Sequence, residues 1–124
     1  MQLCINTTIV ENSLASTGDT SNPYICNDTY DKVYLLSYKD ITNEEYGFKD
    51  NASRQKQLTD YAKALGCYMD TDTEYYNNGC YWLRSPRSNI DDFARYVHSS
   101  GVIYSGWVDY VNVGVSSAIT ISLS

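Results

Sequence analysis

Large apolar side chains are densest in the segment 79–86, which is also closed by a proline. A short, continuous apolar run bounded by turn-forming residues is typical of a buried strand. Pro86 cannot donate to a sheet ladder, so it marks the end of this strand. The pattern therefore predicts a central strand with Trp82 and Leu83 at or near the core. Arg84 is expected at the strand end, where its guanidinium bonds backbone carbonyls or an acid.

Shorter segments elsewhere in the chain also have strand character. They combine β-branched and aromatic residues and are separated by clusters of Gly, Ser, Asn and Asp. The run 33–36 is apolar on both faces, so we expect it in the interior. A turn at 99–101 predicts a hairpin, and a further turn is expected at Ser105 and Gly106. The predicted strands, besides the central one, are 5–10, 33–36, 67–69, 94–98, 102–104 and 118–123.

Two short helices are predicted in the first half of the chain. Ser37, followed by an acid three residues later, is a capping-box variant that opens a helix through about Tyr46, and Gly47 is suited to end it. Thr59 is a good N-cap for a second helix that ends before Gly66. Because helices come early and hairpins late, we predict a single α+β domain over 1–124, with two short helices beside a twisted antiparallel sheet.

Charge and hydropathy exclude two classes of partner. The 124 residues carry 15 acids and 9 bases, a net charge of −6, and the bases are scattered rather than clustered. Such a surface does not favour a nucleic-acid backbone. No apolar run is long enough for a membrane span, and the first residues lack the features of a signal peptide. We therefore expect either a cytoplasmic protein or an exported one given without its leader.

The four cysteines, at positions 4, 26, 67 and 80, contain no C-x-x-C pair, so their spacing does not indicate zinc. Cys67 and Cys80 flank a polar loop of twelve residues and would close a hairpin as a disulfide. Cys4 and Cys26 would close the N-terminal arm. Four free thiols are the alternative, because sequence alone does not choose among the pairings.

The sequence motifs predict neither a catalytic group nor a metal site. The acidic segment 70–74 is spaced like part of a calcium loop, but it lacks the glycine and the distal glutamate of an EF-hand. We expect a solvated loop there, with a weak calcium site as the alternative. His98 is the sole histidine and there is no nucleophile elbow, so no Ser-His-Asp triad is predicted.

Four ordered landmarks resemble a known family. They read YDKVYLLS (30–37), YGF (46–48), TDYAKA (59–64) and YWLRSP (81–86). These resemble the DUF6273 domain, a family abundant in gut Firmicutes, over about residues 25–123. The family is in turn similar to the C-type-lectin-like and formylglycine-generating-enzyme folds, which implies a lectin-like architecture and a secreted or cell-surface setting.

Two departures from the family pattern stand out. Residues 114–118 read GVSSA, where family members tend to have Gly-Val-Arg-Pro-Ala. Family members also usually have more chain before their Asp-Lys-Val strand (31–33 here), including an aromatic-rich piece that is absent, so we expect a truncated or naturally shortened copy of the domain. Formylglycine-generating enzymes use cysteines near the chain end, whereas the last one here is Cys80, so their activity is not expected to carry over.

Aromatic side chains near the predicted loops suggest a binding role. Tyrosine is abundant, with 13 residues against 2 Phe and 2 Trp, and Tyr and Trp offer large contact areas at low rotamer cost. We therefore expect a non-catalytic binding module for glycans or a surface protein. The alternatives are an enzyme related to the formylglycine-generating-enzyme fold and a purely structural domain, in which the tyrosines cover a small hydrophobic core. The predicted binding residues are Tyr75, Tyr76, Tyr104, Trp107 and Tyr110.

Overall fold

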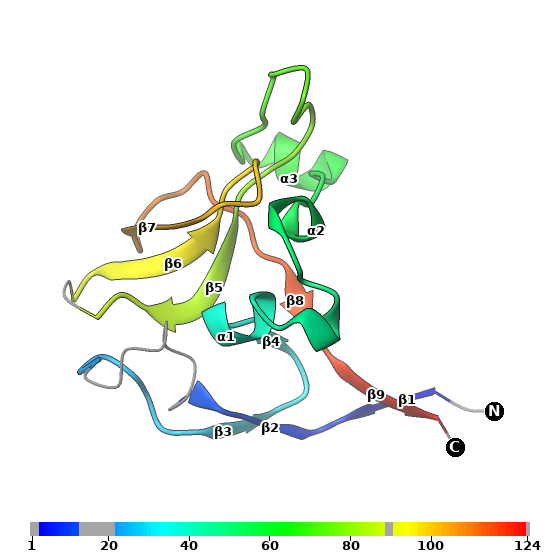
Figure 1. Ribbon diagram of the computed structural model, residues 1–124, viewed down its shortest axis with the longest axis vertical. Helices are drawn as coiled ribbons and strands as arrows, with labels where there is room; N and C mark the ends of the chain where they lie inside the picture. The colour runs from blue at the N-terminus through cyan, green and yellow to red at the C-terminus, as the bar shows by residue number, and fades with distance from the viewer. Residues whose placement is uncertain (1–2, 13–21, 89–90, 124) are drawn as a thin grey trace.

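The strands that the structure describes pair in four small antiparallel sheets, and short helices stand beside them (Figure 1). A computed structural model describes residues 3–12, 22–88 and 91–123. In chain order the elements are β1 (Leu3–Asn6), β2 (Thr8–Val10), β3 (Thr29–Asp31), β4 (Tyr34–Leu35), α1 (Tyr38–Ile41), the 3-10 helix η2 (Glu44–Tyr46), α2 (Asn51–Arg54), α3 (Asp60–Ala64), β5 (Tyr81–Pro86), β6 (Phe93–Val97), β7 (Ile103–Trp107), β8 (Ser117–Ala118) and β9 (Thr120–Leu123).

The predicted α+β class is confirmed, but the single twisted sheet is not. The largest sheet has three strands in the order β5-β6-β7, and the others are the pairs β1-β9, β2-β3 and β4-β8. Three of these four sheets therefore have only two strands each. A two-stranded sheet is marginally stable by itself.

The hydrophobic core lies on one face of the three-stranded sheet. Its buried members are Ile41, Tyr81, Leu83 and Val97, and partly buried residues pack around them. Because side chains alternate along a strand, Tyr81 and Leu83 point to this core while Trp82 between them points to the opposite face. The prediction is confirmed for Leu83 and wrong for Trp82, which is only partly buried and outside the core cluster.

Both predicted helix starts are confirmed at the level of individual hydrogen bonds. The Ser37 hydroxyl accepts from the backbone of Asp40 at 3.0 Å, and the Asp40 carboxylate accepts from the backbone of Ser37 at 2.9 Å. The Thr59 hydroxyl likewise caps α3. The first helix is interrupted after Ile41 and resumes as η2, which ends at Gly47 with φ of 91°.

Several predicted boundaries change. The strand expected over 5–10 is two strands, and the 33–36 run contributes only Tyr34 and Leu35, with Val33 59% exposed rather than interior. Residues 67–69 form no strand, and Ser105 and Gly106 continue β7 instead of turning. Helix α2, which the sequence pattern did not predict, is capped by Asp50.

Arg84 ties the central strand to its neighbours. Its Nη1 donates to the Leu35 carbonyl at 2.7 Å and to the Asp40 carboxylate at 2.8 Å, so β5 is joined to β4 and α1. A backbone carbonyl and an acid are the two partners expected from its place in the sequence. As predicted, the strand that carries it ends at Pro86.

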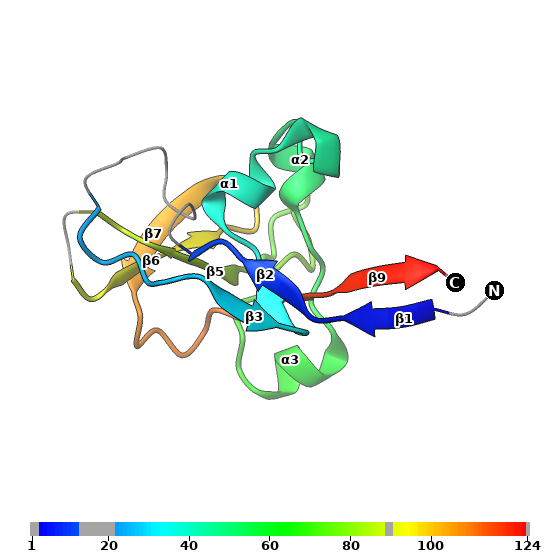
Figure 2. The ribbon, with the colours of Figure 1, turned by 90° about the horizontal axis from the view of Figure 1, so that it is seen from below.

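A two-stranded ribbon extends away from the rest of the molecule and carries both described ends of the chain (Figures 1 and 2). Ile5 of β1 faces Ile121 of β9 in this ribbon, and both side chains are about half exposed. Within the described residues, no helix is both long and apolar enough to cross a bilayer.

Candidate functional site

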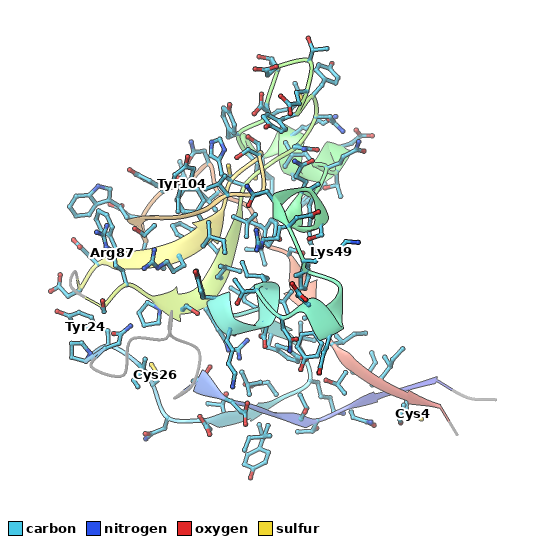
Figure 3. The ribbon with its side chains drawn as sticks, viewed as in Figure 1. Cys4, Tyr24, Cys26, Lys49, Arg87 and Tyr104 are labelled. Atoms are coloured by element: carbon cyan, nitrogen blue, oxygen red, sulfur yellow. The ribbon has the colours of Figure 1, made fainter. Side chains whose placement is uncertain are left out.

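An aromatic row crosses the three-stranded sheet on the face away from the core. Trp82 of β5 stands opposite Tyr96 of β6, and Tyr96 stands opposite Tyr104 of β7. The first two ring centroids are 5.8 Å apart in an edge-to-face arrangement, and the second pair are 6.2 Å apart. Figure 3 shows Tyr104 beside this sheet, away from α1. Cross-strand aromatic pairs of this kind stabilise a sheet and leave their outer edges available for contact.

Two further rings continue the row. His98 lies two residues beyond Tyr96 on the same face of the sheet, and its ring stands edge-to-face with Tyr104 at 5.3 Å. Tyr68, from the segment after α3, follows at 6.2 Å from His98. The backbone of Tyr68 is held in place by its N–H, which donates to the Asn112 carbonyl at 2.9 Å.

Tyr110 completes the site because β7 has a glycine beneath it. A methyl group at Gly106 would come within 2.7 Å of the Tyr110 ring and 3.1 Å of the Tyr96 ring. The absent side chain therefore lets Tyr110 lie close over the strand beside Tyr96. The turn that delivers Tyr110 is closed by its N–H, which donates to the Trp107 carbonyl at 3.1 Å.

Four of these rings, those of Tyr68, Tyr96, His98 and Tyr110, line an open cavity of about 320 Å³, which we call the tyrosine pocket. Its volume is within the range of small-ligand sites. The pocket is lined by Tyr68, Cys80, Tyr96, His98, Tyr110, Asn112 and Val113.

Polar groups of the pocket are unused by the protein. The hydroxyls of Tyr68, Tyr96 and Tyr110, and the side-chain amide of Asn112, make no hydrogen bond to the described part of the chain. Tyr68 and Tyr110 are 41% and 43% exposed, so their ring faces are accessible as well. The lining of the pocket thus combines aromatic rings with polar groups that the described part of the chain leaves without a partner.

A buried acid lies behind the pocket. The Ser99 hydroxyl donates to the Asp70 carboxylate at 2.5 Å and is 3.2 Å from Nδ1 of His98. This hydrogen bond, together with one from the Asp72 backbone, lowers the pKa of Asp70 below its ordinary value. Asp70 is therefore ionised at neutral pH.

The same three side-chain types do not form a catalytic triad. Ser99 is completely buried, so its hydroxyl cannot reach a substrate, and it donates to the acid rather than to the histidine. The acidic segment 70–74 also uses its carboxylates locally, with Asp70 accepting from Asp72 and Asp72 from Glu74. Among the described residues, no cluster of three or more His, Cys, Asp or Glu could hold a metal ion.

All four cysteines are free thiols in this structure. Burial raises the pKa of the Cys80 thiol, so this group is protonated and weakly nucleophilic at neutral pH. Cys4 and Cys26 lie on opposite sides of the molecule (Figure 3), so the disulfide predicted between them does not form in this arrangement. Cys67 lies beside Gly114, as does the Cys80 carbonyl, and a bridge between Cys67 and Cys80 stays a prediction for the oxidised protein.

The structure brings together some of the five predicted binding residues. Tyr110 lines the pocket and Tyr104 belongs to its aromatic row. Trp107 packs edge-to-face on Phe93 at 4.6 Å and borders, with Tyr110, a shallow depression at the 107–112 turn. Tyr75 and Tyr76 lie instead on the 70–78 loop and do not line the pocket.

Sequence reasoning missed Tyr68, Tyr96 and His98. A signal for two of them was present, because a hairpin turning at 99–101 places residues 96 and 98 on one face, with Tyr104 opposite. Tyr68 comes from a segment without regular structure, so neither periodicity nor spacing could have placed it.

A larger cleft of about 600 Å³ opens between β2 and the β8–β9 segment. The ion pair of Arg84 and Asp40 lies in its wall, and exposed isoleucines, including Ile119 and Ile121, form much of its rim. The two charges are bound to each other, with 2.8 Å between Arg84 Nη1 and the Asp40 carboxylate.

The chain was compared with known families, curated proteins and solved structures. The sequence profile described as "Domain of unknown function (DUF6273)" matches residues 1–123. The matched range includes residues 1–24, which lie outside the range of about 25–123 expected from the four landmarks. No curated protein and no solved structure matches the chain. Because the profile spans nearly the whole sequence, the chain belongs to the DUF6273 family.

Proposed function

We propose that this chain is a non-catalytic carbohydrate-binding module whose ligand occupies the tyrosine pocket. The observation that carries the proposal is that three tyrosines and Asn112, whose hydroxyls and side-chain amide have no hydrogen-bond partner among the described residues, line one cavity of about 320 Å³. A pyranose ring has an apolar C–H face and a rim of hydroxyls. The tyrosine rings would pack against the C–H face of the sugar, and the free polar groups would form hydrogen bonds with the sugar hydroxyls.

A binding role is favoured over an enzyme by the state of the reactive groups. The Cys80 thiol is the one strong nucleophile type in the pocket lining, and burial keeps it protonated. Nδ1 of His98 faces the hydroxyls of Ser99 and Ser100. No activated nucleophile or paired carboxylate therefore opens on the cavity.

The proposal extends to setting and architecture. We infer a secreted or cell-surface bacterial protein and a C-type-lectin-like arrangement, which the DUF6273 resemblance implies. Sugar recognition suits a protein displayed outside the cell, where glycans, mucin and peptidoglycan are encountered.

The test is a binding screen of the purified domain against glycans, mucin and peptidoglycan, with and without calcium. Tyr110→Ala removes a ring of the pocket and is expected to abolish binding. The matched control, Tyr76→Ala, removes a tyrosine that is 61% exposed on the 70–78 loop and should leave binding unchanged. Both variants are first checked for native near-ultraviolet circular dichroism.

A third variant, Gly106→Ala, keeps every pocket side chain but displaces the Tyr110 ring, because the new methyl would overlap it. We expect weaker binding with little change in stability, since a ring edge can shift. Retained binding by folded Tyr110→Ala protein would exclude the pocket. Hydrolysis of a screened glycan would favour the enzyme alternative.

A further inference from the structure

The tyrosine pocket has an electrostatic character that narrows its ligand. Among the residues that the structure describes, no lysine or arginine lines it, and His98 is the one basic side chain of its lining. The ionised Asp70 lies directly behind the wall, one hydroxyl group away from His98. Its negative charge contributes, after burial, to raising the pKa of both Tyr68 and Cys80. The whole chain adds a net charge of −6.

The aromatic rings of the pocket also favour a cationic ligand over an anionic one. An aromatic ring has negative potential over its face and attracts a cation placed there, most strongly where water is excluded. Tyr68, Tyr96 and Tyr110 border the same small cavity, so a cationic group inside it would meet several rings at once. An anionic group there would face both the ring potential and the Asp70 charge, and no lysine or arginine among the described lining residues would balance it.

We propose that the ligand is a carbohydrate bearing an ammonium group, and that this group enters the tyrosine pocket. The inference rests on the proposed carbohydrate function and specifies the ligand's chemical class. Acidic sugars, which carry carboxylate, sulfate or phosphate groups, are excluded from the pocket by the same electrostatics.

The test uses two oligosaccharides of equal length that differ in charge. One is a glucosamine oligosaccharide with trimethylated amines, which are charged at every pH, and the other is its N-acetylated counterpart. Calorimetric titration at low salt should give about tenfold or greater preference for the charged one, since a cation–π contact with two or three rings is worth roughly that factor. Choline should compete with it, whereas the uncharged carbon isostere of choline, dimethylbutanol, should not.

Variants separate ring chemistry from hydroxyl chemistry. Tyr110→Phe keeps the ring and is expected to keep most of the preference for the charged oligosaccharide, while Tyr110→Leu should lose it. Asp70→Asn preserves the shape of the acid and should reduce the preference. Urea denaturation of each variant confirms that it is folded before titration.

The outcomes distinguish this inference from the proposed function. Equal or tighter binding of the N-acetylated oligosaccharide would overturn the ammonium inference and support carbohydrate binding. Binding of choline without either oligosaccharide would support the cation pocket and overturn the carbohydrate function. Absence of binding by choline and by both oligosaccharides would overturn both.

Discussion

Replacing Gly101 by alanine should destabilise the protein far more than the same change at Gly66. Both glycines have left-handed backbone angles, with φ of 86° and 90°. A Cβ at Gly66 would meet open space, whereas a Cβ at Gly101 would overlap the backbone carbonyl of Asn51, at the start of α2. The two substitutions therefore share a conformational cost and differ in one steric contact.

The magnitudes follow from these two terms. An alanine in the left-handed conformation destabilises the folded state by roughly 1–2 kcal/mol. Alanine also reduces the conformational entropy of the unfolded chain, which offsets about 0.4–1 kcal/mol of this loss. Gly66→Ala should thus lower the free energy of unfolding by between about 0 and 1.6 kcal/mol. At Gly101 the overlapping atom is backbone, which no rotamer change can remove, so overpacking adds about 1–3 kcal/mol. We expect a total loss of about 1–4.6 kcal/mol for Gly101→Ala.

Urea denaturation followed by tryptophan fluorescence measures both values, provided that the dependence on urea is unchanged. The turn at Gly101 also connects β6 to β7 and so fixes the position of His98, because the Gly101 N–H donates to the His98 carbonyl at 2.8 Å. Equal losses in the two variants would refute the packing of this turn against α2.

Three further predictions concern the core, the pH dependence and the thiols. Leu83→Ala should lower the free energy of unfolding by about 2–5 kcal/mol, because it leaves a cavity in the core. Trp82→Ala should lower it less, because Trp82 lies on the outer face of the sheet. Equilibrium unfolding measures both losses, and the reverse order would contradict the assignment of the two faces. Burial raises the pKa of Tyr81 to about 12, above its ordinary value of about 10, so the neutral phenol stabilises the fold and that contribution is lost as pH rises between these values. Tyr81→Phe should flatten the fall in unfolding free energy over that pH window, and an unaltered slope would count against the assignment. In native protein, a thiol reagent should modify the exposed Cys26 fastest and the buried Cys80 slowest, and fewer than four thiols in unfolded, unreduced protein would indicate a disulfide.

Local signals predicted the helix starts and the end of the central strand well. Capping groups at Ser37 and Thr59 act on neighbouring backbone, and Pro86 acts on its own ladder position, so none of them depends on distant residues. The face of Trp82 was not predictable in the same way. A run that is apolar at every position has no alternation, so only tertiary packing decides which side chains reach the core.

Some residues of the candidate site could be predicted from the sequence, and the others depend on tertiary packing. Tyr104 and Tyr110 stand out as aromatic residues near turns, but the pocket also needs Tyr68, from a distant segment, and a glycine at position 106. Gly106 reads in sequence as a turn, whereas in the fold it makes room for the Tyr110 ring. Such long-range contacts are set by the docking of separate segments, which no single stretch of sequence encodes.

Carbohydrate binding at the tyrosine pocket is tested most directly by nuclear magnetic resonance of tyrosine ring signals during separate titrations with the trimethylated glucosamine oligosaccharide and with its N-acetylated counterpart. The account predicts shifts concentrated in Tyr68, Tyr96 and Tyr110, with the ring of Tyr61, which is 74% exposed on α3, unchanged. Shifts confined to Tyr75 and Tyr76 on the 70–78 loop, or no shifts at a saturating concentration, would contradict it.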